Sequence, residues 1–169
     1  MKPVPAILPI RGTARAVLAA LIEDLALLGF DAGLLAEAEV PEGAYDQRRH
    51  QYRAEAFLGL ARRAAGAAGK RVLGVTDRDL YAEDLNFVFG LAESPGRAAV
   101  ISLTRLRQSD DAARQRARVV KEAVHELGHT FGLDHCSDPR CVMYFSNTLA
   151  DTDHKGREVC PTCRAQLGG

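Results

Sequence analysis

The chain has 169 residues, the size of one domain, and 47% of them are hydrophobic, enough for an apolar core without disulfide staples. It carries 22 basic and 22 acidic residues, so its formal net charge is zero, which argues against nucleic acid as a partner. Its longest apolar stretch, residues 14–30, is interrupted by Arg15, Glu23 and Asp24, which argues against a membrane span. We therefore expect a cytoplasmic monomer with a single domain, residues 1–169.

The first part of the chain alternates strand and helix patterns. Residues 6–10 form a short apolar run that predicts a strand, and residues 13–28 have the apolar spacing of a helix with Thr13 as its N-cap. A second strand is expected within residues 32–40, before a turn. Residues 47–65 form an amphipathic stripe that predicts a second helix.

The middle of the chain predicts further strands and one long helix. Residues 71–75 have the pattern of a buried strand, and residues 86–91 and 98–103 predict two more strands around a turn-rich segment. The long helix is expected to begin at residue 109 or 110 and to continue to about residue 131, and a short one at residues 160–167. The arginines before and within the long helix are interpreted as a solvated face. The alternation indicates an α/β unit of the α+β type with an irregular tail.

The residues that bind metals gather at the end of the chain, where all four cysteines and four of the five histidines lie. His125 and His129, four positions apart on the long helix, project from the same face and can hold one ion. Glu126 is rotated away from this pair and can hydrogen-bond a water on the metal. Gly132 accepts the backbone conformation that ends a helix, so the chain can turn back and deliver His135 as a third ligand.

Three histidines leave one coordination position open, as catalytic zinc sites do. Zinc lowers the pKa of a bound water to about 7, and Glu126 would take the water proton as general base and pass it to the leaving amine. The motif therefore predicts a zinc-dependent peptidase. The alternative interpretation is an amphipathic helix that carries two histidines by chance, but it leaves Gly132 and His135 as further coincidences.

The cysteines form two short-spaced pairs, Cys136 with Cys141 and Cys160 with Cys163, separated by 18 residues. Four thiolates suit a closed tetrahedral zinc site, which would be structural because it leaves no open position. Two disulfides, four free thiols and a redox role for the second pair are the alternatives. Because His135 and Cys136 are consecutive, the two metal sites must be neighbours.

Together these residues resemble the metzincin metallopeptidases, and the cysteines with Met143 resemble one branch, the archaemetzincins. Segments between residues 74 and 106 are also similar, so the resemblance covers about residues 70–163. It implies a metzincin-like twisted mixed β-sheet with packed helices, an active-site helix in an N-terminal subdomain at residues 1–132, and a small zinc-stabilised C-terminal subdomain at residues 133–169.

The resemblance also implies roles for single residues. Two zinc ions are expected per chain, and Met143 would form the Met-turn beneath the catalytic ion, although its chemistry alone suggests ordinary core packing. The implied ligands of the catalytic zinc are His125, His129 and His135, the general base is Glu126, and the structural ligands are Cys136, Cys141, Cys160 and Cys163.

The substrate implied is a peptide in extended form, bound along the strand at residues 86–91. One departure concerns Phe145, which stands where some metzincins have a tyrosine that assists the oxyanion; Tyr144 is adjacent but would point elsewhere. This departure leaves room for a second function, a two-zinc module that binds peptides or proteins with weak or no hydrolysis. The intact Glu126 argues for the enzyme.

Overall fold

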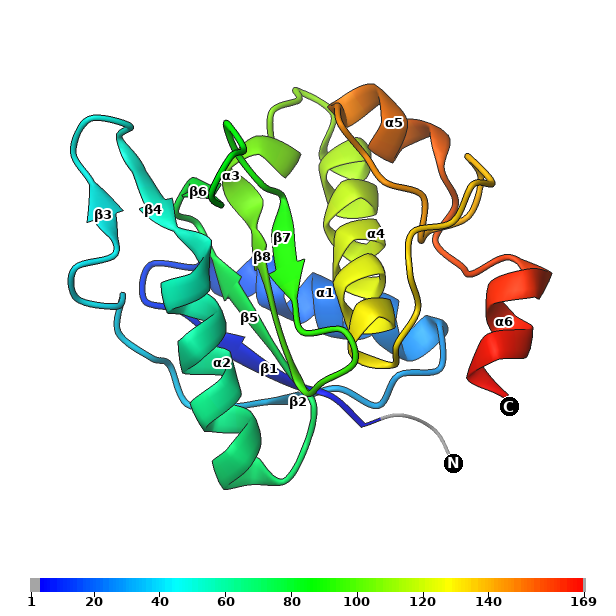
Figure 1. Ribbon diagram of the computed structural model, residues 1–169, viewed down its shortest axis with the longest axis horizontal. Helices are drawn as coiled ribbons and strands as arrows, with labels where there is room; N and C mark the ends of the chain where they lie inside the picture. Colours follow the sequence, from blue (N-terminus) through cyan, green and yellow to red (C-terminus); the bar gives the residue numbers. More distant parts are fainter. Residues whose placement is uncertain (1–3, 169) are drawn as a thin grey trace.

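The computed structural model describes residues 4–168 and is built on a sheet of five strands (Figure 1). The strands are, in spatial order, β2 (Gly33–Leu34), β1 (Ala6–Pro9), β5 (Val72–Thr76), β8 (Ala98–Ser102) and β7 (Gly90–Ala92). All neighbours are parallel except β7, which runs antiparallel to β8 at the edge. Every residue of β1, β5 and β8 is buried, which explains their continuous apolar sequences.

Helices cover both faces of this sheet (Figure 1). α1 (Arg15–Leu27) and α4 (Ala112–Thr130) pack on one face, and α2 (Ala54–Ala68) packs on the other. Alternate strand residues serve the two layers: Ile7 contacts the first core and Leu8 the second. The predicted twisted mixed sheet with packed helices is therefore confirmed.

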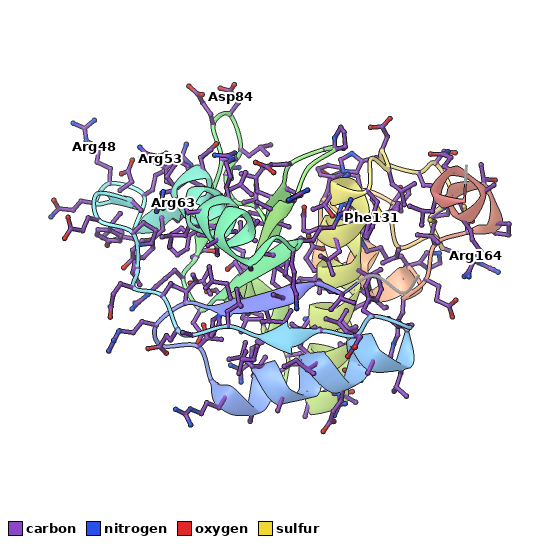
Figure 2. All side chains as sticks on the ribbon, turned by 90° about the horizontal axis from the view of Figure 1, so that it is seen from below. Arg48, Arg53, Arg63, Asp84, Phe131 and Arg164 are labelled. Carbon is purple, nitrogen blue, oxygen red and sulfur yellow. The ribbon has the colours of Figure 1, made fainter. Side chains whose placement is uncertain are left out.

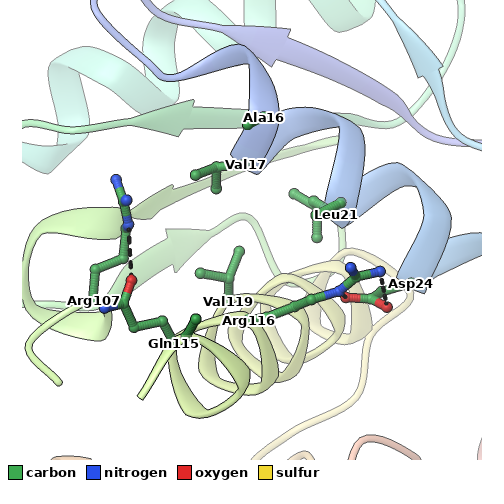
Figure 3. Close-up of a pocket in the computed structure, with 10 residues that line it drawn as sticks. Ala16, Val17, Leu21, Asp24, Arg107, Gln115, Arg116 and Val119 are labelled. Carbon is green, nitrogen blue, oxygen red and sulfur yellow. Dashed lines mark hydrogen bonds and ion pairs between the residues drawn. The ribbon is translucent and has the colours of Figure 1, made fainter. Parts of the chain in front are cut away.

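The interface between α1 and α4 combines an apolar contact with an ion pair in which only the carboxylate is buried (Figure 3). Arg116 on α4 donates two hydrogen bonds to Asp24 on α1, at 2.8 and 2.9 Å, and Asp24 is buried. Arg107 and Gln115 close the other end of a small gap of about 160 Å³ beside Val119. These contacts fix the orientation of α4 on the sheet.

A second, small sheet corrects the prediction of a helix over residues 47–65. Its strands are β3 (Tyr45–Asp46), β4 (Gln51–Arg53) and β6 (Leu80–Tyr81), and α2 begins only at Ala54. The amphipathic pattern is overridden by tertiary pairing. The amide nitrogen of Tyr52 donates to the carbonyl of Asp79, and buried Gln51 donates to Asp79 and to the carbonyl of Asn86.

Other boundaries also differ from the expectations. Thr13 does not cap α1, because its hydroxyl donates to the carbonyls of Ile10 and Val75; Ala14 is the N-cap. The strand expected at residues 86–91 is shifted to Gly90–Ala92, since Val88 forms a bridge with Leu80 instead. The remaining shifts are a shorter β2, a short helix α3 (Leu103–Leu106) directly after β8, and a start of α4 two residues after the later of the two expected positions.

The end of the chain holds two short helices, α5 (Leu149–His154), which was not expected, and α6 (Pro161–Leu167). Arg118 of α4 is 5% exposed and donates to both carboxylate oxygens of Asp153 on α5, each at 2.7 Å. The interpretation of the arginines as a solvated face is therefore wrong for Arg118, which anchors the C-terminal segment. In residues 4–168 no helix is long and apolar enough to cross a bilayer. The subdomain boundary at residue 132 stays a prediction.

Candidate active site and metal centres

The C-terminal half of α4 and the turn that follows it bring the three predicted histidines together. Gly132 has a φ of 89° and ends the helix, as the sequence indicates, so that the chain returns past its last turn. The ring nitrogens that His125, His129 and His135 offer to a metal lie within 4.8 Å of one another. His125 is buried, His129 is half-buried and His135 is exposed, so one side of the cluster faces solvent.

The hydrogen bonds of two of these rings prepare them for a metal. Nδ1 of His125 donates to the carbonyl of Val142 at 2.8 Å, and Nδ1 of His129 donates to the carbonyl of Leu133 at 2.7 Å. In the neutral rings Nε2 then carries a lone pair, the form that binds metal. Burial, and secondarily the charge of Lys155, lowers the pKa of His125 to about 2 and keeps that ring neutral.

The spacing of the ring nitrogens fits zinc. Nε2 of His125 and Nε2 of His129 are 3.2 Å apart, with a lone pair on each. Two nitrogens bound at about 2.0–2.1 Å to one tetrahedral ion lie about 3.3–3.4 Å apart. The arrangement is therefore suited to a cation held between the rings.

Glu126 is one member of a buried pair of carboxyl groups beside the histidines. Glu126 and Glu122, one helical turn earlier, are 5% and 4% exposed, and both line the same cleft as the histidines. Burial, followed by the charge of Glu122, raises the pKa of Glu126 well above its usual range, and burial also raises the pKa of Glu122. The two groups thus hold protons more readily than exposed carboxyls do.

Lys155 supplies a buried positive charge to this pair. Its side chain is 1% exposed and its Nζ donates to the carbonyl of Tyr144 at 3.1 Å. Burial lowers the pKa of Lys155, while the charges of Glu122 and Glu126 act in the opposite direction. Lys155 therefore brings a positive charge from the C-terminal segment close enough to act on the carboxyl groups of α4, and its Nζ also lies 3.4 Å from Nδ1 of His125.

The four predicted cysteines form a second cluster whose spacing also fits zinc. Sγ of Cys136 lies 3.8 Å from Sγ of Cys160, and Sγ of Cys141 lies 3.8 Å from Sγ of Cys163. Thiolates bound at about 2.3 Å to a tetrahedral ion are about 3.8 Å apart, whereas a disulfide requires about 2.0 Å. Backbone amides of Asp138 and Cys160 donate to two of the sulfurs, as they would to thiolates.

Met143 lies directly beneath the histidine-bearing turn of α4 and is fully buried. A Cβ atom on Gly128 would overlap Sδ of Met143 and would lie 3.1 Å from its Cε. Gly128 is therefore required for the close approach of Met143, between the positions of His125 and His129 on the helix. The amide of Cys136 donates to the carbonyl of Met143 at 3.0 Å, which joins this turn to the cysteine cluster.

An open cleft of about 480 Å³ lies between α4 and the edge strand β7, and the histidines and both buried glutamates line it. Phe145 forms part of its wall and its ring centroid is 4.9 Å from that of His135. Tyr144 is not among the residues that line the cleft, in agreement with the expectation that it points elsewhere.

Sequence reasoning missed three residues of this site, namely Glu122, Lys155 and Gly90. Glu122 could have been found from its spacing, four positions before Glu126 on the same helix face. A Cβ on Gly90 would lie 2.6 Å from Cγ of Glu126 and 2.8 Å from the carbonyl oxygen of Val100. No sequence signal distinguishes Gly90 or Lys155 from ordinary strand and surface residues, because their roles depend on the tertiary fold.

A site of this kind, with an open cluster of imidazoles beside a carboxylate, is that of a zinc-dependent hydrolase, and comparisons with known proteins identify its family. The chain belongs to peptidase family M54, whose family model matches residues 24–168. It is 52% identical over 130 residues to the archaemetzincin of Methanopyrus kandleri, and the alignment covers 77% of this chain and 73% of that protein. It is 46% identical over 136 residues to the archaemetzincin of Natronomonas pharaonis, and that alignment covers 76% of this chain and 78% of that protein.

A solved structure agrees with these relatives over nearly the whole chain. The crystal structure of archaemetzincin from Archaeoglobus fulgidus matches with a TM-score of 0.86 at 37% identity, covering 96% of this chain and 99% of that one. The expected archaemetzincin resemblance and fold are thus confirmed. The protein is a zinc metallopeptidase that acts on peptides, and its histidine and cysteine clusters provide two sites for zinc.

Proposed function

We propose that peptide hydrolysis takes place in the cleft between α4 and β7, with His125, His129 and His135 as ligands of the catalytic zinc and Glu126 as general base. The proposal is supported above all by the convergence of three imidazoles beside a buried carboxylate in an open cleft. Zinc, when bound, lowers the pKa of a coordinated water to about 7 and polarises a substrate carbonyl. Glu126 accepts the water proton at its carboxylate and transfers it to the leaving amine.

The substrate is an extended peptide that lies along β7. This strand is the last in the sheet and pairs with β8 on one side, so its other edge is available for backbone hydrogen bonds to a peptide. The cleft wall includes Leu85 and Phe145, which are 45% and 44% exposed. Apolar side chains near the scissile bond therefore suit this cleft.

The remaining predicted residues have supporting roles in this proposal. The four cysteines hold a closed zinc site that fastens residues 133–169 to the end of α4, Met143 forms the floor under the catalytic ligands, and Gly132 allows the turn to His135. Because His135 and Cys136 are adjacent, the structural ion also fixes the third catalytic ligand. Thiolate ligands persist where thiols stay reduced, so we infer a cytoplasmic location. Balanced charge supports a monomer that does not bind nucleic acid.

The second candidate function is peptide binding with little hydrolysis. It is favoured by Phe145, which lines the cleft and brings no hydroxyl group to the position of the missing tyrosine. The position of Glu126 argues against it, because a carboxyl group that only supports a binding site has no reason to be buried beside the metal ligands.

The decisive experiment compares wild type with Glu126→Gln on a library of unstructured peptides. We expect the variant to keep its zinc and its fold while cleavage falls by about 10²–10⁴-fold, since proton transfer by a positioned base contributes a factor of that order. Glu83→Gln, at an exposed position outside the cleft, is the matched control and should cleave like wild type. Identical cleavage profiles for wild type and Glu126→Gln would remove Glu126 from the mechanism and favour the binding function.

A further inference from the structure

A large groove lies at the end of α4, separate from the catalytic cleft. It has a volume of about 750 Å³ and runs between the start of β1, the end of α4 and helix α6. Figure 2 labels two of its lining residues, Phe131 at the end of α4 and Arg164 on α6. Apolar side chains such as Phe30 and Leu133 also line it. A cavity of this size holds a drug-sized ligand or a short peptide segment.

The groove is strongly positive although the whole chain has no net charge. Its lining contains five basic residues: Lys70, Arg71, Arg97, Arg157 and Arg164. The acidic residue in the lining is Glu158, and Arg164 already pairs with it at 3.0 Å. A concentration of one sign of charge over an apolar surface favours a ligand of the opposite sign.

Arg71 is the clearest indication of a missing anionic partner. Its guanidinium lies 3.8 Å from the centroid of the Phe131 ring, which fixes the orientation of the side chain. Its Nε is buried and has no hydrogen-bond partner within residues 4–168. Burial and the nearby charge of Arg97 lower the pKa of Arg71, as expected for two guanidinium groups without a carboxylate between them.

The groove adjoins the catalytic cleft through the loop between β7 and β8. Ser94 in this loop lines the cleft, and Arg97, three residues later, lines the groove. The amide of Gly96 donates to the carbonyl of Thr130 at 3.1 Å, which holds the loop against the end of α4. A peptide that lies along β7 and continues past Ser94 therefore reaches the positive groove.

We propose that this groove binds an acidic and apolar segment of the peptide substrate, at a distance from the bond that is cleaved. The inference rests on the proposed function, because the same substrate occupies the cleft. Carboxylates of the segment pair with Arg71 and Arg97, and its apolar side chains pack on Phe131 and Leu133. The site selects substrates by charge outside the catalytic cleft and adds affinity without taking part in proton transfer.

The test uses the Glu126→Gln protein, so that no peptide is cleaved, and fluorescence anisotropy of a labelled hexapeptide of alternating Glu and Leu. The comparison peptide replaces each Glu by Gln. We expect the acidic peptide to bind at least about tenfold more tightly, because charge-assisted hydrogen bonds are stronger than neutral ones. The preference should shrink in about 0.5 M NaCl, where the Debye length is about 4 Å. Equal binding of the two peptides at low salt would overturn the proposal.

Variants locate the binding site. Arg97→Glu changes an exposed side chain, so it should fold normally and weaken the acidic peptide by about tenfold or more. Arg71→Gln should weaken it similarly, while Arg63→Glu, an equal charge change on the exposed face of α2, should not alter it. Unchanged binding in Arg97→Glu would contradict the assignment even if Arg71→Gln failed to fold.

A cleavage assay separates this proposal from the proposed function. For substrates that carry the acidic segment beyond the cleft, wild type should show a KM about tenfold lower than for the glutamine version, with kcat unchanged, and Arg97→Glu should lose the difference. Cleavage of both substrates with equal KM would leave the peptidase assignment intact and would contradict the proposal that the groove binds the substrate. If the protein binds the acidic peptide but cleaves neither substrate, the groove proposal stands and the catalytic proposal is contradicted.

Discussion

Replacing Gly90 with alanine tests whether the edge strand positions the general base. The new Cβ would lie 2.6 Å from Cγ and 2.7 Å from Oε1 of Glu126, on the side of the carboxylate that faces β7. It would also lie 2.8 Å from the carbonyl oxygen of Val100, which is part of the neighbouring strand and cannot rotate away. The steric strain must therefore be relieved mainly by movement of Glu126.

The size of the effect follows from these distances. An ordinary contact between carbon atoms needs about 3.5–4.0 Å, so the Glu126 side chain must retreat by about 1 Å. A misplacement of that size can reduce turnover by about a hundredfold. Overpacking costs about 1–3 kcal/mol of folding stability. Alanine offsets about 0.5–1 kcal/mol of that cost, because its unfolded chain has less backbone entropy to lose on folding than that of glycine. We expect about a hundredfold loss of kcat/KM with a stability loss of only about 1–2 kcal/mol.

Three measurements on the purified Gly90→Ala variant check this expectation: cleavage of fluorogenic peptides, zinc content and the free energy of unfolding in urea. Gly33→Ala is the matched control, because Gly33 also lies in a strand and its added Cβ would meet nothing within 4 Å. The control should behave like wild type. If Gly90→Ala cleaves peptides at the wild-type rate with wild-type zinc content, the close contact between β7 and Glu126 does not position the base.

Three further predictions concern the supporting structure. Cys163→Ser should lower the zinc content from two ions per chain toward one and weaken the retained catalytic ion, as measured by metal analysis after mild chelation; full retention of both ions contradicts the four-thiolate site. Lys155→Met should reduce the free energy of unfolding by about 2–4 kcal/mol, because it leaves two buried carboxyls without a cation, and a neutral effect would mean that they are not charged in the fold. Hydrogen bonds from Arg118 lower the pKa of Asp153, so the stabilisation from this pair is present above the unfolded pKa near 4 and is lost as the pH falls below it. Asp153→Asn should therefore be about 1–2 kcal/mol less stable than wild type at pH 7, and the difference should vanish in acid titrations monitored by circular dichroism.

Much of the catalytic end of the molecule could be predicted because its chemistry depends on local spacing. The four-residue interval between His125 and His129 places both rings on one face of any α-helix, and Gly132 marks the turn that brings back His135. The four cysteines are likewise recognisable as two short pairs. The structure brings each set together as expected, and the distances between ligand atoms fit the coordination geometry of zinc.

The errors have a common physical origin in contacts between distant parts of the chain. Gln51 and Tyr52 have the spacing of a helix, but pairing with the segment around Asp79 makes them a strand. Thr13 is a good N-cap residue, yet its hydroxyl donates a hydrogen bond to the carbonyl of Val75 on strand β5 instead. Lys155 belongs to a polar tail in the sequence and becomes one of the most buried side chains only because that tail folds over α4.

The central claim is that three imidazoles hold a zinc ion that keeps one position for water. The most direct measurement is anomalous diffraction from crystals of the zinc-loaded protein, collected on both sides of the zinc absorption edge. It should reveal one ion bound by His125, His129 and His135 at about 2.0–2.1 Å with a solvent molecule completing the tetrahedron, and a second among the four cysteines at about 2.3 Å. A first ion that lacks His135, or that has a fourth protein side chain in the solvent position, would contradict the account.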